Sequence, residues 1–406
     1  CLSQADIRVT PLEIGGGFGG KTTVYLEPVA MLLSRKSGRS VRLAMSRADV
    51  FRATGPAPGG IVEVTLGAKA DGTLVGADLK LFYHTGAFPG NGIHSGVGSP
   101  IGHYRVDAFS VYGMDVLTNL PGCHAYRAPG APQVNFAVES AMDELALKLG
   151  MDPLDLRLKN TARPGDPGLS GAPNGHIGYA ECLEAAKAHP HWSAPLGPNQ
   201  GRGVAAGYWG NYGGPSTASV SLAGGGTGLV TEGSPDIGGS RAAVAVMAAE
   251  TLQVPYEKVR VTIADTSSIG FSMVTGGSCT TFATGKAVTD AALKVIDTLK
   301  GRAAASWGVD PAEVEWRDGA AHCRSGDKAG QVLTIGQISA RAAFTGGPIA
   351  EEVSLNAAGY LPGFAVHICD TAVDPQTGVV TVTRYTTVQD VGRAIHPDYV
   401  EGQMQG

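Results

Sequence analysis

The sequence has 406 residues, of which 43% are hydrophobic and 17% charged, and its formal net charge at pH 7 is −5. This length exceeds what one hydrophobic core comfortably holds, and the composition excludes a disordered chain and a coiled coil. The acidic balance, without a run of Lys or Arg, argues against nucleic acid as a partner, whereas 59 glycines, about twice the usual share, indicate backbone in close contact with a ligand.

The first elements follow a strand, loop and helix order. A strand is predicted over Ile7 to Ile14, followed by the glycine loop Gly15 to Thr22 and a helix that ends at Gly38. Two strands at residues 60–69 and 73–87 come next. The Asp-Gly pair between them is a strong hairpin signal.

The next segment closes a first lobe. Helical spacing runs from Val134 to Leu149, and Asp152-Pro153 provides a cap and a first-turn proline for a second, short helix. We place the first lobe at residues 1–160. Residues 161–203 are rich in Pro, Gly, Ser and Asn, which indicates a connecting segment that wraps a surface.

A second lobe, residues 204–406, repeats the alternation of strands and amphipathic helices. Its predicted elements are strands within 216–231, a helix at 241–252, a strand at 258–264, a helix at 284–300 and a closing hairpin of 364–369 with 379–389. The predicted fold class is therefore α+β, with two mixed α/β lobes.

The six cysteines are scattered without a CxxC pair, so we interpret them as reduced thiols, mostly buried, and not as zinc or iron–sulfur ligands. No apolar run reaches membrane-spanning length and the first residues do not form a signal peptide. We expect a cytoplasmic protein without a membrane span. Because the sequence opens on Cys1 and not on Met, its true start is expected to be missing, which leaves a periplasmic location open.

The loop Gly15 to Thr22, GGGFGGKT, formally satisfies the P-loop pattern GxxxxGK[ST]. A P-loop NTPase also requires a second apolar strand that ends in a magnesium-binding Asp, within a parallel sheet. The elements that follow look like an antiparallel hairpin instead. Three interpretations stay open for the loop alone: nucleotide binding, a purely structural turn, and contact with another phosphate-bearing group.

Four further motifs follow this loop in a fixed order: AYRAPGAPQ at 125–133, DIGGS at 236–240, TGGSCTT at 275–281 and DVGRAIHP with GQ at 390–403. Together the five resemble the cofactor loops of the molybdenum-cofactor-binding large subunit of molybdenum hydroxylases, the xanthine dehydrogenase and aldehyde oxidase family. The resemblance spans nearly the whole chain. It implies a molybdopterin-type cofactor, in the cytosine dinucleotide form, whose molybdenum is held through the pterin dithiolene and has no direct protein ligand.

The chemistry of the loops suits such a cofactor. Glycine loops expose N–H groups, and a helix beginning near Thr284 would add donors and partial positive charge for a phosphate. The fork of Arg127 would hold an oxygen of the metal centre or of the product. For each Ser and Thr, helix capping is the alternative role. The resemblance assigns cofactor contacts to Gly17, Phe18, Gly19, Arg127, Gly238, Gly239, Ser278, Thr280, Thr281 and Gln403.

Some positions differ from the family's pattern, and these differences narrow the range of expected substrates. Purine-oxidising members carry a glutamate where this chain has Thr22, and a stacking phenylalanine where it has Pro129. Carbon monoxide-oxidising members carry a copper-binding cysteine in place of Ala128. We therefore expect neither a purine nor carbon monoxide. Gly239 stands where many members have a glutamine, and His124 is a further candidate for the substrate pocket.

By resemblance, the reaction hydroxylates an aldehyde, an N-heteroaromatic or a related carbon with oxygen from water; aryl thioesters stay open as a reductive alternative. The family's general-base glutamate lies in a GVGE-like segment past the GQ motif, and these residues contain no GVGE. We expect that glutamate in a missing part of the chain or, alternatively, on a second polypeptide.

Iron–sulfur and FAD subunits are the expected partners, in a dimer of heteromers. A non-catalytic scaffold is the other class of function that stays open.

Overall fold

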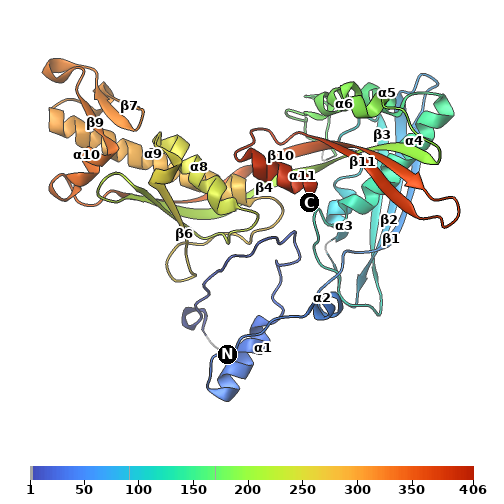
Figure 1. Ribbon diagram of the computed structural model, residues 1–406, viewed down its shortest axis with the longest axis horizontal. Coiled ribbons are helices and arrows are strands. Elements are labelled where there is room, and N and C mark those ends of the chain that lie inside the picture. Colours follow the sequence, from blue (N-terminus) through green and yellow to red (C-terminus); the bar gives the residue numbers. More distant parts are fainter. Residues whose placement is uncertain (1–2, 91, 170) are drawn as a thin grey trace. The chain divides into compact units, whose positions relative to one another are not determined.

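The computed structural model describes residues 3–90, 92–169 and 171–406, so the first cysteine lies outside the described residues. The chain forms two compact units, whose helices and strands are labelled in Figure 1. Unit 1 comprises Cys1–Gly17, Asn211–Tyr360 and Arg393–Gly406; unit 2 comprises Phe18–Gly210 and Leu361–Gly392. These units differ from two successive lobes because β4 (Gln200–Leu222) and β10 (Ala350–Val373) each contribute residues to both.

Unit 2 contains the predicted first hairpin. Strand β1 (Gly60–Ala68) pairs antiparallel with β2 (Leu74–Gly86), and β3 (Ala108–Leu117) pairs parallel with β2. The turn closes through the hydrogen bond from Gly72 N to Lys69 O, at 2.9 Å. The predicted closing hairpin is also confirmed, since β11 (Val380–Gln389) pairs antiparallel with β10.

The helices of unit 2 build its core beside these strands. The predicted helix after the second loop is α4, which buries Val134, Val138 and Met142. Asp152 caps α5 as predicted, because its carboxylate accepts hydrogen bonds from Leu154 N and Asp155 N. The helices are α1 (Glu27–Ser37), α2 (Arg47–Ala53), α3 (Gly92–Val97), α4 (Ala131–Leu149), α5 (Pro153–Lys159), α6 (Tyr179–Ala188) and α7 (Pro190–Ser193).

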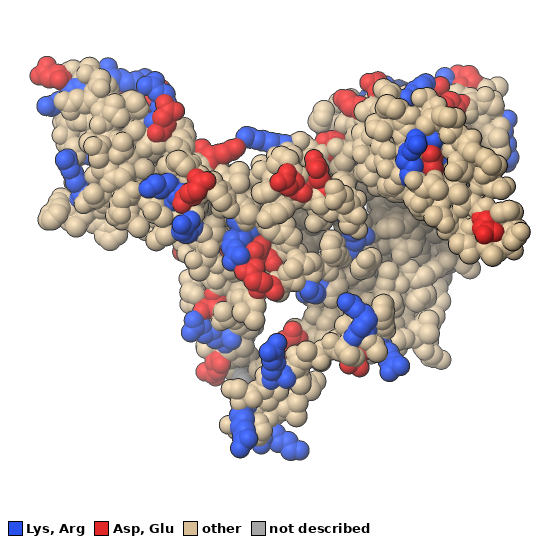
Figure 2. Space-filling model, viewed as in Figure 1, with Lys and Arg blue, Asp and Glu red and all other residues tan. Residues whose placement is uncertain are grey.

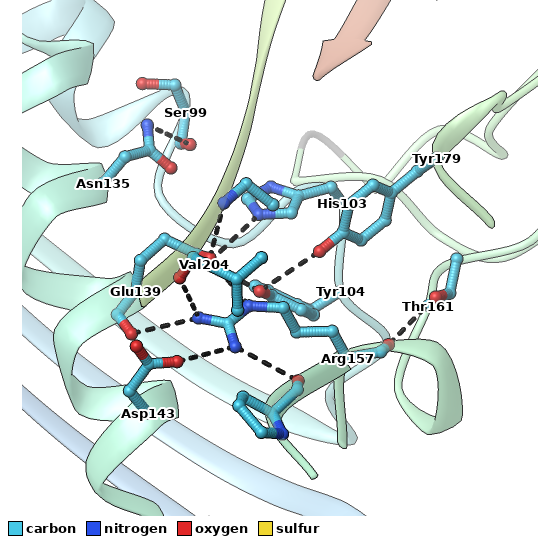
Figure 3. Close-up of polar contacts among 12 residues, drawn as sticks. Ser99, His103, Tyr104, Asn135, Glu139, Asp143, Arg157, Thr161, Tyr179 and Val204 are labelled. Atoms are coloured by element: carbon cyan, nitrogen blue, oxygen red, sulfur yellow. Dashed lines mark hydrogen bonds and ion pairs between the residues drawn. The ribbon is translucent and has the colours of Figure 1, made fainter. Parts of the chain in front are cut away.

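A buried ionic network joins the helices α4 and α5 to the strand β4 (Figure 3). Arg157 of α5 is fully buried and donates from Nε to Glu139 Oε2 of α4 at 2.9 Å, while its Nη1 lies 2.7 Å from Asp143 Oδ1. Glu139 also accepts from the Tyr104 hydroxyl at 2.5 Å and from Ala206 N of β4 at 2.7 Å. This network fixes α4, the helix whose first turn contains the last residues of the second predicted cofactor loop.

Unit 1 contains the predicted elements of the second half of the chain. Strand β5 (Gly228–Glu232) pairs antiparallel with β4 and parallel with β6 (Val259–Ile263). Helices α8 (Ser240–Leu252) and α9 (Thr280–Trp307) pack on each other and supply most of the core. Helix α11 (Pro397–Gln405) contains the end of the last motif, including Gln403. The α+β fold class agrees with the prediction.

Two local predictions are wrong. Residues 7–14 are not a strand; the residue after them, Gly15, forms an isolated bridge with Ile237, and Pro11 has no N–H to give to a ladder. The stretch predicted as a surface connection contains α6, which fully buries Tyr179 and Leu183. The Pro and Gly residues around α6 obscured its helical spacing.

The sequence interpretation also missed a small antiparallel sheet in unit 1. Its strands are β7 (Val314–Arg317), β8 (Ala320–Cys323) and β9 (Val332–Thr334), followed by α10 (Ile335–Ala340). These strands have three or four residues each, too few for period-two alternation to be recognised.

Candidate functional site

In unit 2, the first and second predicted cofactor loops pack directly against each other. Arg127 N donates to Phe18 O at 2.6 Å, and the Arg127 guanidinium carbon lies 5.4 Å from the centre of the Phe18 ring. Gly19 has φ +92°, and a Cβ built there would lie 3.0 Å from Ala125 O. Loops more than a hundred residues apart in sequence therefore meet at Phe18, Gly19 and Arg127.

The predicted substrate-pocket residues lie on the same two loops. The Thr22 hydroxyl donates to Gly19 O at 2.8 Å, and His124 N donates to Pro56 O at 3.0 Å. The His124 ring meets Tyr25 edge-on with centroids 6.1 Å apart. Pro129 is partly exposed two residues after Arg127. The Thr22 hydroxyl thus bonds within the first loop, at Gly19, the residue that packs against Ala125 of the second loop.

In unit 1, the start of the first loop pairs with the third loop. Gly238 N donates to Gly15 O at 2.8 Å, beside the bridge between Gly15 and Ile237. Helix α11 flanks this loop, because a Cβ on Gly238 would lie 3.4 Å from Gln403 Nε2 and the Tyr399 ring packs against Gly239. Gly238, Gly239 and Gln403, predicted as cofactor contacts, are therefore neighbours.

The fourth loop ends at the N-terminus of α9, and here the predicted helix start is wrong. The helix begins at Thr280 and not near Thr284, so Thr280 and Thr281 belong to its first turn. Ser278 has φ +62°, and the N-cap residue Cys279 makes no side-chain capping hydrogen bond. No side chain of Ser278, Thr280 or Thr281 therefore acts as this helix's N-cap. Backbone donors of the first turn, together with the partial positive charge there, suit an anion.

The P-loop alternative fails on local structure. A phosphate-binding P-loop lies between a strand and a helix. Here residues 3–14 form no strand, and Phe18 to Lys21 form a turn that is separated from α1 by five residues, 22–26. The strands that follow pair as an antiparallel hairpin.

The distribution of charged and metal-ligating side chains bears on the sequence-based expectations. Figure 2 shows Lys and Arg interspersed with Asp and Glu on the visible face. Within residues 3–90, 92–169 and 171–406, no three His, Cys, Asp or Glu side chains are grouped as metal ligands. In the same part of the chain, no helix is long and apolar enough to cross a bilayer. Five cysteines are free thiols, of which Cys182, Cys279 and Cys323 are buried.

The sequence interpretation missed a buried carboxyl beside the third loop. Glu232, at the end of β5, is 1% exposed, and burial is the main cause that raises its pKa to about 7; the charge of Asp236 acts in the same direction. Its Oε2 accepts a hydrogen bond from Ser234 N at 2.5 Å. Its position as the last residue of an apolar strand, four residues before DIGGS, was the available signal.

We expect Glu232→Gln to stabilise the protein at alkaline pH. A carboxyl whose pKa is raised in the folded state favours folding while protonated, and this contribution is lost as pH rises from about 4.5 through about 7. At pH 8 the wild type carries the full penalty, up to about 3 kcal/mol, whereas the glutamine stays neutral and keeps an acceptor for Ser234 N. Thermal unfolding between pH 5 and pH 8 measures this; a Tm difference between variant and wild type that does not grow with pH would contradict it.

Comparisons with known proteins match nearly the whole chain. Two family models, each described as a molybdopterin cofactor-binding domain, match residues 1–161 and 176–406. The chain is 32% identical to the putative xanthine dehydrogenase molybdenum-binding subunit XdhA of Escherichia coli (strain K12), over 98% of this chain and 56% of that protein. It is 29% identical to the aldehyde oxidoreductase molybdenum-binding subunit PaoC of the same strain, over 99% and 54%. The chain thus spans about half the length of these curated relatives.

Solved structures show the same fold. The aldehyde oxidoreductase from Desulfovibrio gigas superposes with a TM-score of 0.78 at 25% identity, covering 96% of this chain and 43% of that chain. Quinoline 2-oxidoreductase from Pseudomonas putida 86 superposes with a TM-score of 0.87 at 22% identity, covering 98% and 56%. The predicted architecture, two mixed α/β regions typical of molybdenum-cofactor-binding proteins, is confirmed.

Proposed function

The chain belongs to the molybdopterin cofactor-binding domain family, and from this premise we propose that it binds a molybdenum cofactor within an oxidoreductase that hydroxylates an aldehyde, an N-heteroaromatic or a related carbon. One observation carries the proposal: residues of a single glycine loop bond to two other loops. Arg127 N donates to Phe18 O in unit 2, and Gly238 N donates to Gly15 O in unit 1. These are the loops that the family resemblance assigns to the cofactor.

The donor groups of these loops fit a phosphate-bearing, oxygen-rich cofactor. The N-terminus of α9 offers backbone N–H groups without a side-chain cap, and hydroxyls of Ser278, Thr280 and Thr281 lie at or beside its first turn. In unit 2, Arg127 adds a permanent positive charge that suits an oxygen of the reacting centre. The proposed contacts are Gly17, Phe18, Gly19, Arg127, Gly238, Gly239, Ser278, Thr280, Thr281 and Gln403.

When bound, such a cofactor supplies the redox chemistry that inserts oxygen from water and passes electrons onward. The role of this chain is to bind and orient the cofactor and to stabilise the charge that develops during the reaction. Arg127 would stabilise negative charge that develops on the product oxygen, which is where a positioned cation lowers a barrier most. Phe18 holds Arg127 at two points. Its carbonyl accepts a hydrogen bond from Arg127 N, and its ring lies against the Arg127 guanidinium.

The substrate proposal rests on three residues of the first and second loops. Thr22, Ala128 and Pro129 replace the residues that the purine- and carbon monoxide-oxidising members use. We propose an aldehyde or an N-heteroaromatic as substrate, which is compatible with relatives named for aldehyde and quinoline oxidation. We also propose the cytosine dinucleotide form of the cofactor.

We propose partner subunits that carry iron–sulfur clusters and FAD. A further relative, 28% identical, is named as subunit gamma of the 6-hydroxypseudooxynicotine dehydrogenase complex of Paenarthrobacter nicotinovorans. This supports a multi-subunit assembly. The GVGE-like base segment would come from outside the 406 residues.

The test is to purify the assembled complex and measure molybdenum and pterin per chain. Activity with a dye acceptor is then assayed on aldehydes, N-heteroaromatics and aryl thioesters. Molybdenum near one per chain with oxidation of either of the first two classes supports the proposal. A freshly purified complex without molybdenum would support a scaffold function instead.

We expect Gly19→Ala to lower the molybdenum content several-fold. The added methyl would press on Ala125 O at 3.0 Å, at a φ of +92° that alanine rarely adopts, and would displace the loop of Arg127. Gly150→Ala is the matched control, because Gly150 also has positive φ, +66°, with nothing within 4 Å of the added Cβ. The control should lose about 1 to 2 kcal/mol of stability and keep its molybdenum. Equal molybdenum in both variants would contradict contact between Gly19's loop and the cofactor.

A further inference from the structure

Three buried hydroxyl groups in unit 1 form a hydrogen-bonded chain, which we call the hydroxyl cluster: Ser216, Ser234 and Thr284. Thr284 Oγ1 lies 3.0 Å from Ser216 Oγ and 2.8 Å from Ser234 Oγ. All three residues are at most 3% exposed. Thr284 is therefore the centre of the cluster, and each neighbour depends on it for a hydrogen bond within the protein interior.

The cluster joins two loops that are far apart in sequence. Ser234 lies two residues before Asp236, where the third loop begins, and Thr284 lies one helical turn after Thr280, where α9 begins. Ser234 is fixed a second time by its backbone, because Ser234 N donates to the Glu232 carboxylate. Ser216 attaches the pair to β4.

The helices that follow these loops are in close contact at the same level. Gly285 of α9 packs against Met247 of α8, where a Cβ on the glycine would lie 2.3 Å from Met247 Sδ. Packing alone lets two helices slide by small amounts, whereas a buried hydrogen bond fixes donor and acceptor atoms to within tenths of an ångström. The hydroxyl of Thr284 supplies this second, directional restraint.

We propose that Thr284 is a positioning residue that sets the first turn of α9 relative to the third loop, so that both present their donors to one ligand. This inference rests on the proposed function, because the ligand is the molybdenum cofactor. Thr284 itself is buried and does not touch the cofactor; it acts through Ser234 and through its own helix. Removing its hydroxyl leaves two buried hydroxyls without their partner, which is costly.

The test compares Thr284→Val, which keeps the shape and removes the hydroxyl, with Thr284→Ser, which restores it. In the assembled complex we expect Thr284→Val to retain at least five-fold less molybdenum and pterin than the wild type after dilution and gel filtration. Thr284→Ser should be close to the wild type. Ser339→Ala is the control, since Ser339 is also a buried hydroxyl of unit 1 and donates to Ile335 O within α10. It should lower Tm without loss of molybdenum.

Hydrogen–deuterium exchange on cofactor-free protein gives a second readout. Thr284→Val should raise exchange at residues 236–240 and 278–283 together, while exchange in the core of α9 stays as in the wild type. Ser216→Ala serves as the second variant if Thr284→Val does not fold. Unchanged exchange and wild-type cofactor retention in Thr284→Val would overturn the inference. A wild-type complex without molybdenum would overturn the proposed function instead, and the exchange experiment would still decide the role of Thr284.

Discussion

Arg127→Ala is expected to lower kcat of the assembled enzyme by about 10²- to 10³-fold, the usual cost of removing one donor that stabilises developing negative charge. The protein should stay folded. Arg127 is exposed, and its contact with the Phe18 ring at 5.4 Å is worth only about 0.5 to 1 kcal/mol at such a site. Tm should therefore fall by a few degrees at most, while turnover nearly disappears.

Two further variants separate charge from geometry. Arg127→Lys keeps a positive charge but loses the planar fork, so we expect an intermediate rate. Arg105→Ala removes another exposed arginine of the same unit and should leave kcat unchanged. Steady-state assays with a dye acceptor, run alongside molybdenum content, measure all three. A near-normal rate for Arg127→Ala with full molybdenum loading would remove Arg127 from the reacting centre.

Strong local signals predicted much of the fold. Asp71-Gly72 and the turn at 374–378 fixed two hairpins, because only a few residue pairs close such turns easily. Asp152-Pro153 fixed the start of α5 in the same way. The cofactor loops were predicted by the order of five motifs along the chain, and the structure then showed backbone hydrogen bonds between the first loop and two others.

The remaining features depended on tertiary contacts that no local pattern encodes. The start of α9 was placed four residues late because residues 278–281 resemble a loop in composition, whereas Thr280 and Thr281 already belong to the first turn of the helix. Thr284 was interpreted as part of a helix start, and only the structure shows its hydroxyl between Ser216 and Ser234. Single polar residues in an apolar stretch do not reveal in advance which partner they find.

The charged residues of α4 and α5 likewise have tertiary partners that no local sequence pattern predicts. Charged residues are rarely fully buried without partners, so helical spacing alone gives no sign that Glu139 or Arg157 is buried. In the structure, Glu139 and Arg157 are at most 3% exposed. The helical period predicts which residues share a face of a helix. It does not predict that a second helix packs against the charged face.

Arg157→Met is expected to destabilise unit 2 by about 3 to 5 kcal/mol, because it leaves the Glu139 carboxylate buried without its compensating charge. The guanidinium also donates to Val204 O at 3.3 Å, so β4 loses a bond as well (Figure 3). Replacing both partners, Glu139→Leu with Arg157→Met, should cost less than the sum of the single changes. Chemical denaturation of the cofactor-free protein, analysed as a double-mutant cycle, measures this coupling.

Acid titration tests the same network independently. Burial by itself raises the pKa of Glu139, but the charge of Arg157 and the polar contacts with His103 and Tyr104 outweigh it and hold the pKa at about 2. A carboxyl whose pKa is lowered stabilises the fold above its unfolded value, near 4.5, and this stabilisation is lost as pH falls toward 2.

The wild type should therefore lose stability between pH 5 and pH 3 more steeply than Glu139→Gln, which has no proton to take up at this position. Parallel pH slopes for the two proteins, or additive costs in the double-mutant cycle, would show that Arg157 is held by Asp143 and the backbone carbonyls and not by Glu139. In that case α4, and with it the loop of Arg127, would be anchored by packing and not by the buried ion pair.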